Sequence, residues 1–164
     1  MSDAKHWQRW TRASVFKVLN DHFVTTHSVD QAAVYYDGLE RRTQDHDPTF
    51  ELRMDGPVHT QVDKKLRYLD IEINILIQTV YDTTDLYAHD RNVGIAFDIL
   101  KNPVCAYKYG GGVDDDDSLW TTYSLWQDPG KSKHIKTSHF GQVDVGVNVQ
   151  QSTIEAPYRA LLEF

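Results

Sequence analysis

The fold is decided by residues 66–80, which read LRYLDIEINILIQTV. Apolar side chains occupy every second position from Leu69 to Ile77, and polar side chains fill the positions between them up to Asn74. Successive side chains of a β-strand point to opposite faces, so this pattern predicts one strand with an apolar and a polar face. Strands are commonly about 5–6 residues long. A strand of this length is therefore expected to be the central member of an antiparallel sheet.

Two helices are predicted from apolar residues at helical spacing. The first covers about 11–23, with Thr11 as a candidate cap, and the second covers about 84–101. Asn102-Pro103 should end the second helix, because proline disfavours helical conformation in the residue before it.

Further strands are predicted from shorter alternating runs. Asp55-Gly56-Pro57 should end the strand that precedes the central one, and Pro157 should place the last strand at an edge or a bulge. The order of elements predicts an α+β fold, with both helices packed on one face of a mainly antiparallel sheet. The additional strands are expected at 34–36, 50–54, 104–109, 119–126 and 152–162.

Length and composition restrict the class of protein. The 164 residues predict a single domain, 1–164, and the formal charge of −7 argues against a general nucleic-acid binder. No run approaches the ~20 consecutive apolar residues of a membrane helix, so no membrane association is expected. The first residues lack the apolar segment of a signal peptide, and the single Cys105 allows no intrachain disulfide, which fits the cytoplasm.

The polar face of the central strand carries the candidate metal or acid–base pair. Asp70 and Glu72 should lie about 7 Å apart on one face, a separation at which two carboxylates can bind a divalent metal or share acid–base work. A restriction-like nuclease would also need a lysine two residues further on, and Asn74 stands there. We therefore favour a polar stripe exposed to solvent or to an interface.

No other pattern predicts catalytic, cofactor-binding or metal-binding residues. His134 and His139 do not have a zinc-ligand spacing, and the glycines at 110–112 lack the lysine and hydroxyl of a phosphate-binding loop. The acidic run Asp114, Asp115, Asp116 and Asp117 does not alternate as calcium ligands do. We interpret this run as the solvated tip of a flexible loop.

The chain resembles the neck and tail-completion proteins of tailed bacteriophages, most closely the tail terminator family. The resemblance covers about two-thirds of the chain and is one of layout. It implies an N-terminal helix, a sheet with a long central strand and a second helix against it, with no catalytic residues and no cofactor. The segments that carry it are FELRMDGP (50–57), DIEINILIQ (70–78) with the helix through Leu100, YKYG (107–110), and SHFGQVD (138–144) with the closing strand.

The resemblance also implies a function and partners. The expected protein is a non-enzymatic virion component, assembled in the host cytoplasm, that forms a ring at the head–tail junction, commonly of six subunits. The ring would contact the tail tube protein and the head connector, and DNA would pass without specific binding. Since clustered carboxylates repel phosphate, residues 114–117 are expected to project into the lumen or towards its rim. The alternative is an ordinary solvated loop on the outer surface of the ring.

Three alternatives remain open. The chain could be another phage neck or tail-tube component with a related fold. It could be a small metal-dependent hydrolase that uses Asp70 and Glu72. It could also be a monomeric ligand-binding α+β domain.

Overall fold

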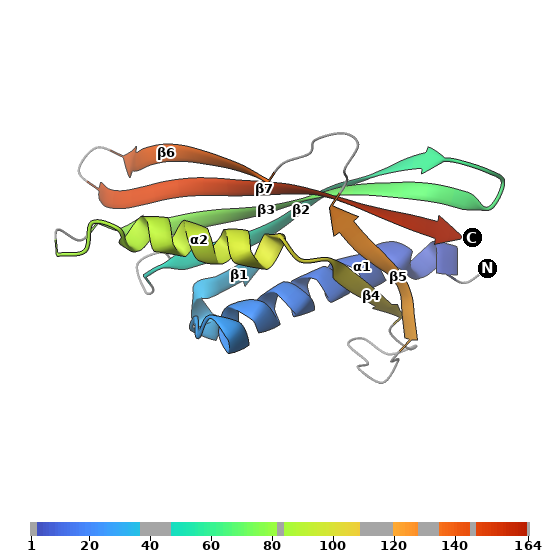
Figure 1. The fold of residues 1–164 in the computed structure, drawn as a ribbon, viewed down its shortest axis with the longest axis horizontal. Helices are drawn as coiled ribbons and strands as arrows, with labels where there is room; N and C mark the ends of the chain where they lie inside the picture. The colour runs from blue at the N-terminus through green and yellow to red at the C-terminus, as the bar shows by residue number, and fades with distance from the viewer. Residues whose placement is uncertain are drawn as a thin grey trace.

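The computed structural model describes residues 3–36, 47–81, 84–108, 120–127, 135–144 and 147–163. It has an α+β fold, in which a seven-stranded sheet carries two α-helices (Figure 1). This confirms the predicted fold class. In chain order the elements are α1 (Asp3–Asp21), the π-helical turn η1 (His22–Thr26), the 3-10 turn η2 (Gln31–Ala33), β1 (Val34–Tyr36), β2 (Thr49–Gln61), β3 (Leu66–Val80), α2 (Ala88–Leu100), β4 (Val104–Lys108), β5 (Trp120–Gln127), β6 (Lys136–Asp144) and β7 (Val147–Glu163).

The sheet is built around β3, as predicted. The strand order is β1-β2-β3-β7-β5-β4, and β6 also pairs with β7. All of the described pairs are antiparallel except β1 with β2, which are parallel. The three long strands β2, β3 and β7 run along the longest axis of the molecule (Figure 1).

The core forms between the two helices and the apolar face of β3. The alternating apolar residues of β3 are all buried there, as the sequence pattern predicted, and the rings of Phe23 and Phe50 pack with centroids 4.6 Å apart. Because residues of both helices join the same cluster, both helices cover one face of the sheet. The cluster includes Val15, Leu19 and Phe23 from α1 and η1, Leu69, Ile71, Ile73, Ile75 and Ile77 from β3, and Ala96, Ile99 and Leu100 from α2.

The helix boundaries differ from the prediction. α1 begins at Asp3, so Thr11 is a buried residue inside the helix and does not cap it. Residues 3–10 include the good helix formers Ala4, Lys5, Gln8 and Arg9, and Trp10 is buried, so the packed part of the helix begins before Thr11. α2 begins at Ala88, later than expected, because Asp85 to Tyr87 form a turn before it.

Asp55-Gly56-Pro57 does not end β2, which corrects the prediction. The strand continues to Gln61, and between the pairs Asp55–Glu72 and Val58–Asp70 it holds one residue more than β3. This is a β-bulge. Gly56 has a φ of +98°, and a Cβ there would lie 3.0 Å from the carbonyl oxygen of Asp70. Glycine is therefore required by both the backbone conformation and the close approach.

The last strand is central, which corrects the edge or bulge predicted from Pro157. β7 is 17 residues long, and its pairing with β3 runs from Leu66–Glu163 to Val80–Val149 without a register shift. On its other side, β7 pairs with β6 up to Glu155 and with β5 from Tyr158. Pro157 lies in the gap between these two ladders, so its missing N–H removes no hydrogen bond there. β6 itself was not predicted.

Candidate functional site

The predicted carboxylate pair lies on the face of β3 opposite the helices. The Asp70 carboxylate accepts hydrogen bonds from Arg159 at 2.7 Å (Nε to Oδ1) and 3.3 Å (Nη2 to Oδ2). Arg159 is the register partner of Asp70 on β7, and its guanidinium lies 4.7 Å from the centre of the Tyr68 ring. Glu72 is exposed and lies opposite Asp55 and Pro157. One carboxylate is thus neutralised within the chain, and the other faces solvent.

This arrangement leads to a prediction about metals. Among the residues that the structure describes, no group of three or more His, Cys, Asp and Glu side chains could hold a metal ion. We expect calorimetric titration with Mg²⁺, Mn²⁺ or Zn²⁺ to show no binding tighter than about millimolar, the weak end for calcium modules. The double variant Asp70→Asn/Glu72→Gln should give the same titration curve. Stoichiometric micromolar binding that this variant abolishes would favour the hydrolase alternative.

A chain of hydrogen bonds joins α2 to three strands inside the sheet–helix interface. His89, in the first turn of α2, contacts Thr79 of β3 at 2.8 Å (Nδ1 to Oγ1) and Ser152 of β7 at 2.7 Å (Nε2 to Oγ). The Ser152 hydroxyl also contacts His139 of β6 at 2.6 Å (Oγ to Nδ1), and Asn92 donates to Thr79 at 3.0 Å. His89, Thr79 and Ser152 are all buried.

Sequence reasoning missed this network. In the sequence, His139 has no zinc-ligand spacing from His134, Ser152 is only the first residue of the strand predicted at 152–162, and His89 belongs to no recognised motif. A signal was present, because Ser152 stands in phase with Ile154, Ala156 and Tyr158 and is therefore a polar residue at a buried position of β7.

The network has the polar contacts of a serine–histidine pair, but a substrate could not reach the serine. A nucleophilic serine needs a neighbouring base, and His89 is at hydrogen-bonding distance. The Ser152 side chain is fully buried, however, and it already contacts a second histidine. Its hydroxyl therefore serves to satisfy buried polar groups and to tie β6, β7 and α2 together.

The burial of His89 predicts a dependence of stability on pH. Burial lowers the pKa of His89 below its ordinary value, His139 acts in the same direction, and Asp90 opposes both. The unfolded chain therefore binds more protons than the folded chain just below pH 6.5, so stability falls as the pH is lowered through this range. The free energy of unfolding, measured with urea at several pH values between about pH 7 and about pH 5, should depend less steeply on pH in His89→Gln than in the wild type.

Two carboxylates with lowered pKa values contribute to unfolding in acid at a lower pH than His89 does. The pKa of Asp98 is lowered by its contact with Lys101, and that of Asp85 by its contact with Arg91, so both carboxylates titrate at lower pH. If the free energy of unfolding changes with pH as steeply in His89→Gln as in the wild type, His89 does not govern the pH dependence.

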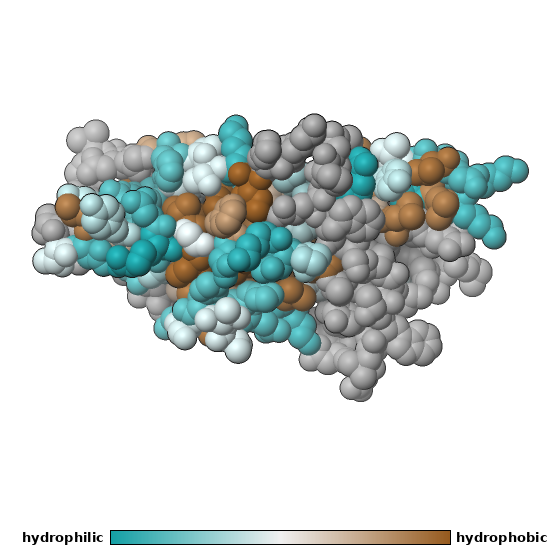
Figure 2. Space-filling model, viewed as in Figure 1, coloured by the Kyte–Doolittle hydropathy of each residue, from teal (hydrophilic) through white to brown (hydrophobic). Residues whose placement is uncertain are grey.

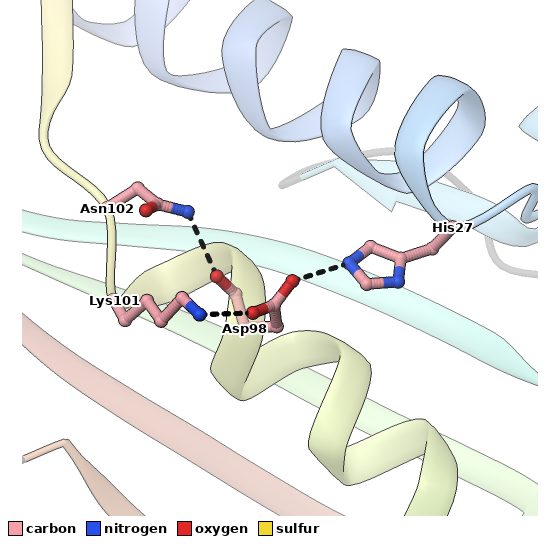
Figure 3. Close-up of polar contacts among 4 residues, drawn as sticks. All are labelled: His27, Asp98, Lys101 and Asn102. Atoms are coloured by element: carbon pink, nitrogen blue, oxygen red, sulfur yellow. Dashed lines mark hydrogen bonds and ion pairs between the residues drawn. The ribbon is translucent and has the colours of Figure 1, made fainter.

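A second polar cluster joins the end of η1 to the end of α2. Asp98 of α2 contacts His27 at 3.0 Å (Oδ2 to Nε2) and Lys101 at 2.5 Å (Oδ1 to Nζ), while Asn102 donates to its carbonyl oxygen (Figure 3). Asn102 thereby satisfies a helix C-terminal carbonyl that has no partner within the helix. The cluster fixes the end of η1 to the end of α2.

Exposed apolar side chains gather at the two ends of the long strands. One end carries Val58, Val62 and Leu161, and the other carries Val80, Tyr81, Leu86 and Tyr87. Figure 2 shows apolar surface at the right-hand end, where the β2–β3 hairpin and the end of β7 lie. Exposed apolar clusters of this kind mark surfaces for association.

Two earlier predictions meet the limits of the described residues. The acidic run at 114–117 and the glycines at 110–112 lie outside them, so the interpretation of the acidic run as a loop tip stays a prediction. Within the described ranges, no helix combines the length and the apolar character needed to cross a membrane.

Comparison with known proteins supports the fold of the chain. No protein-family model and no curated protein sequence matches the chain. A solved structure known only by a sequence identifier matches 93% of this chain and 94% of its own, with a TM-score of 0.54 and 12% identity. At that identity, the match shows a shared α+β fold alone. A chain from the virion of a native gene transfer agent particle matches the same shares at a TM-score of 0.39 and 14% identity, too low a score to carry an argument.

Proposed function

We propose that this chain is a structural protein of a tailed-phage-like virion and acts there as a tail terminator. The observation that carries the proposal is the pair of exposed apolar clusters at opposite ends of the long strands. Tyr87 is 70% exposed, Val58 60% and Leu86 59%. Tyrosine and large apolar residues are typical of protein–protein interfaces. Two distinct association surfaces on one subunit suit a protein that assembles with copies of itself and with neighbours.

The resemblance in layout to tail terminators implies that the assembly is a ring. Copies of the chain would form a ring, commonly of six, that caps the tail tube and meets the head connector. Contacts in a ring are heterologous, so one surface of each subunit must complement a different surface of the next. The protein would have no catalytic role. DNA would pass through the lumen without specific binding, and Asp114 to Asp117 would face it, because carboxylates repel phosphate.

The hydrolase alternative has less support. The Asp70 carboxylate already accepts two hydrogen bonds from Arg159, so a metal would have to displace a charged partner. Another neck or tail-tube position is compatible with the same fold and is distinguished by the partners that the ring binds.

The test combines mass measurement with assembly on tail tubes. Light scattering of the purified chain, alone and with purified tail tubes, should reveal a ring in at least one setting. A density map of the assembled particle should then place the ring at the upper end of the tube and residues 114–117 at its lumen. A chain that stays monomeric at high concentration and does not bind tubes contradicts the proposed function. A ring whose 114–117 loop lies on the outer circumference contradicts the lumen proposal alone.

A further inference from the structure

We propose that neighbouring copies of this chain bind head to tail through the two ends of the long strands, an inference that rests on the proposed ring. We define the hairpin end as Val58, Val62, Lys64, Lys65 and Leu161. We define the tyrosine end as Asp47, Val80, Tyr81, Leu86, Tyr87 and Asp90. The hairpin end of one copy would contact the tyrosine end of the next.

The two ends are too far apart to meet within one copy. β3 has 15 residues and runs from the hairpin end at Leu66 to the tyrosine end at Val80. At about 3.3 Å per residue the strand is roughly 50 Å long. Figure 1 shows the β2–β3 hairpin and the β3–α2 connection at opposite extremes of the long axis. A contact between them must therefore join different molecules.

The hairpin end combines apolar surface with positive charge. Val58, Val62 and Leu161 are each more than 40% exposed. The hairpin over 58–69 contains Lys64, Lys65 and Arg67 against Asp63, and Glu163 of β7 is the register partner of Leu66, so these five charged residues give a net formal charge of +1. Within the described ranges, the ammonium groups of Lys64 and Lys65 make no ion pair, and both residues are exposed. They are thus available to an acidic partner.

The tyrosine end combines apolar surface with negative charge. Over the described residues 80–81 and 84–91, Asp85 and Asp90 stand against Arg91, and Asp47 lies beside Val80, whose N–H it accepts at 2.8 Å. Three carboxylates against one guanidinium give a net formal charge of −2. Arg91 already binds Asp85, which leaves Asp90 and Asp47 as the net charge of this end.

The partner that best fits both surfaces is a second copy of the chain. Each end offers apolar side chains together with the charge that the other end lacks, and such complementarity directs association and fixes its register. Because the two surfaces differ, the contact is heterologous and can repeat around a ring. A contact of like ends would oppose two sets of the same charge.

The contact is tested with two variants that each disable one end. Lys64→Glu/Lys65→Glu reverses the charge of the hairpin end, and Leu86→Ser/Tyr87→Ser removes the apolar surface of the tyrosine end. Each variant alone should self-associate at least about tenfold more weakly than the wild type. An equal mixture should form a 1:1 dimer in sedimentation experiments, because each variant keeps the end that the other needs. Phe97→Ser, an exposed apolar residue of α2 outside both ends, is the matched control and should assemble as the wild type does.

The outcomes separate this inference from the proposed function. A 1:1 dimer in the mixture without any ring of wild-type chains supports the head-to-tail contact and contradicts the ring. A wild-type ring that persists in both variants overturns the head-to-tail contact and leaves the proposed function standing. The absence of the dimer, together with the absence of any ring both in solution and on tail tubes, contradicts both. Circular dichroism of each variant should match the wild type, since all four substituted residues are exposed.

Discussion

Ile73→Ala is expected to lower the free energy of unfolding by about 2–5 kcal/mol, which is the range for buried Ile or Leu to Ala changes. Ile73 is fully buried at the middle of β3, between its register partners Met54 on β2 and Ala156 on β7. The substitution removes three carbon atoms from the interface between the sheet and both helices. Urea unfolding of the purified variant measures the loss directly.

The neighbouring residue provides the control for this change. Glu72 lies next to Ile73 on the same strand but points to the opposite face and is exposed. Glu72→Ala should change stability by no more than about 0.5 kcal/mol, as surface substitutions usually do. A neutral Ile73→Ala variant would show that the apolar face of β3 is not the core of the folded chain.

The central part of the fold could be predicted because its pattern is local and long. Alternation over residues 66–80 predicted β3 with the bounds that the structure gives, Leu66–Val80. The burial of one face of this strand followed from the same pattern. In such a strand, burial of one face fixes the register, since a shift of one residue would move every apolar side chain to the other face.

The predictions were wrong where tertiary structure, and not the local sequence, decides the conformation of a segment. Gly56-Pro57 and Pro157 are typical of turns and edges, but the sheet accommodates the first as a bulge and the second in a gap between two ladders. β6 was not predicted, and its residues 136–140, whose burial the structure describes, do not alternate between buried and exposed. Lys136, Thr137, His139 and Phe140 are all exposed. Neither the gap nor the exposure can be read from neighbouring residues in the sequence.

The candidate site was predicted only in part for the same reason. The shared face of Asp70 and Glu72 follows from strand geometry, but the partner of Asp70 is Arg159, 89 residues away in the chain. The histidine–serine network likewise joins residues from α2, β3, β6 and β7. Only the pairing of these strands brings the side chains together.

The network should also contribute measurably to stability. Ser152→Ala is expected to lower the free energy of unfolding by about 1–3 kcal/mol, the cost of leaving a buried polar group without a partner. The loss arises because Nε2 of the buried His89 would lose its only hydrogen-bond partner in the described part of the chain, whereas the more exposed His139 can turn to water. Ser138→Ala on β6 is the matched control. Ser138 is half-buried and next to His139 in the chain, so its change should stay within about 0.5 kcal/mol. If the two variants unfold at the same urea concentration, the Ser152 hydroxyl does not hold β7 to α2, and packing alone joins them.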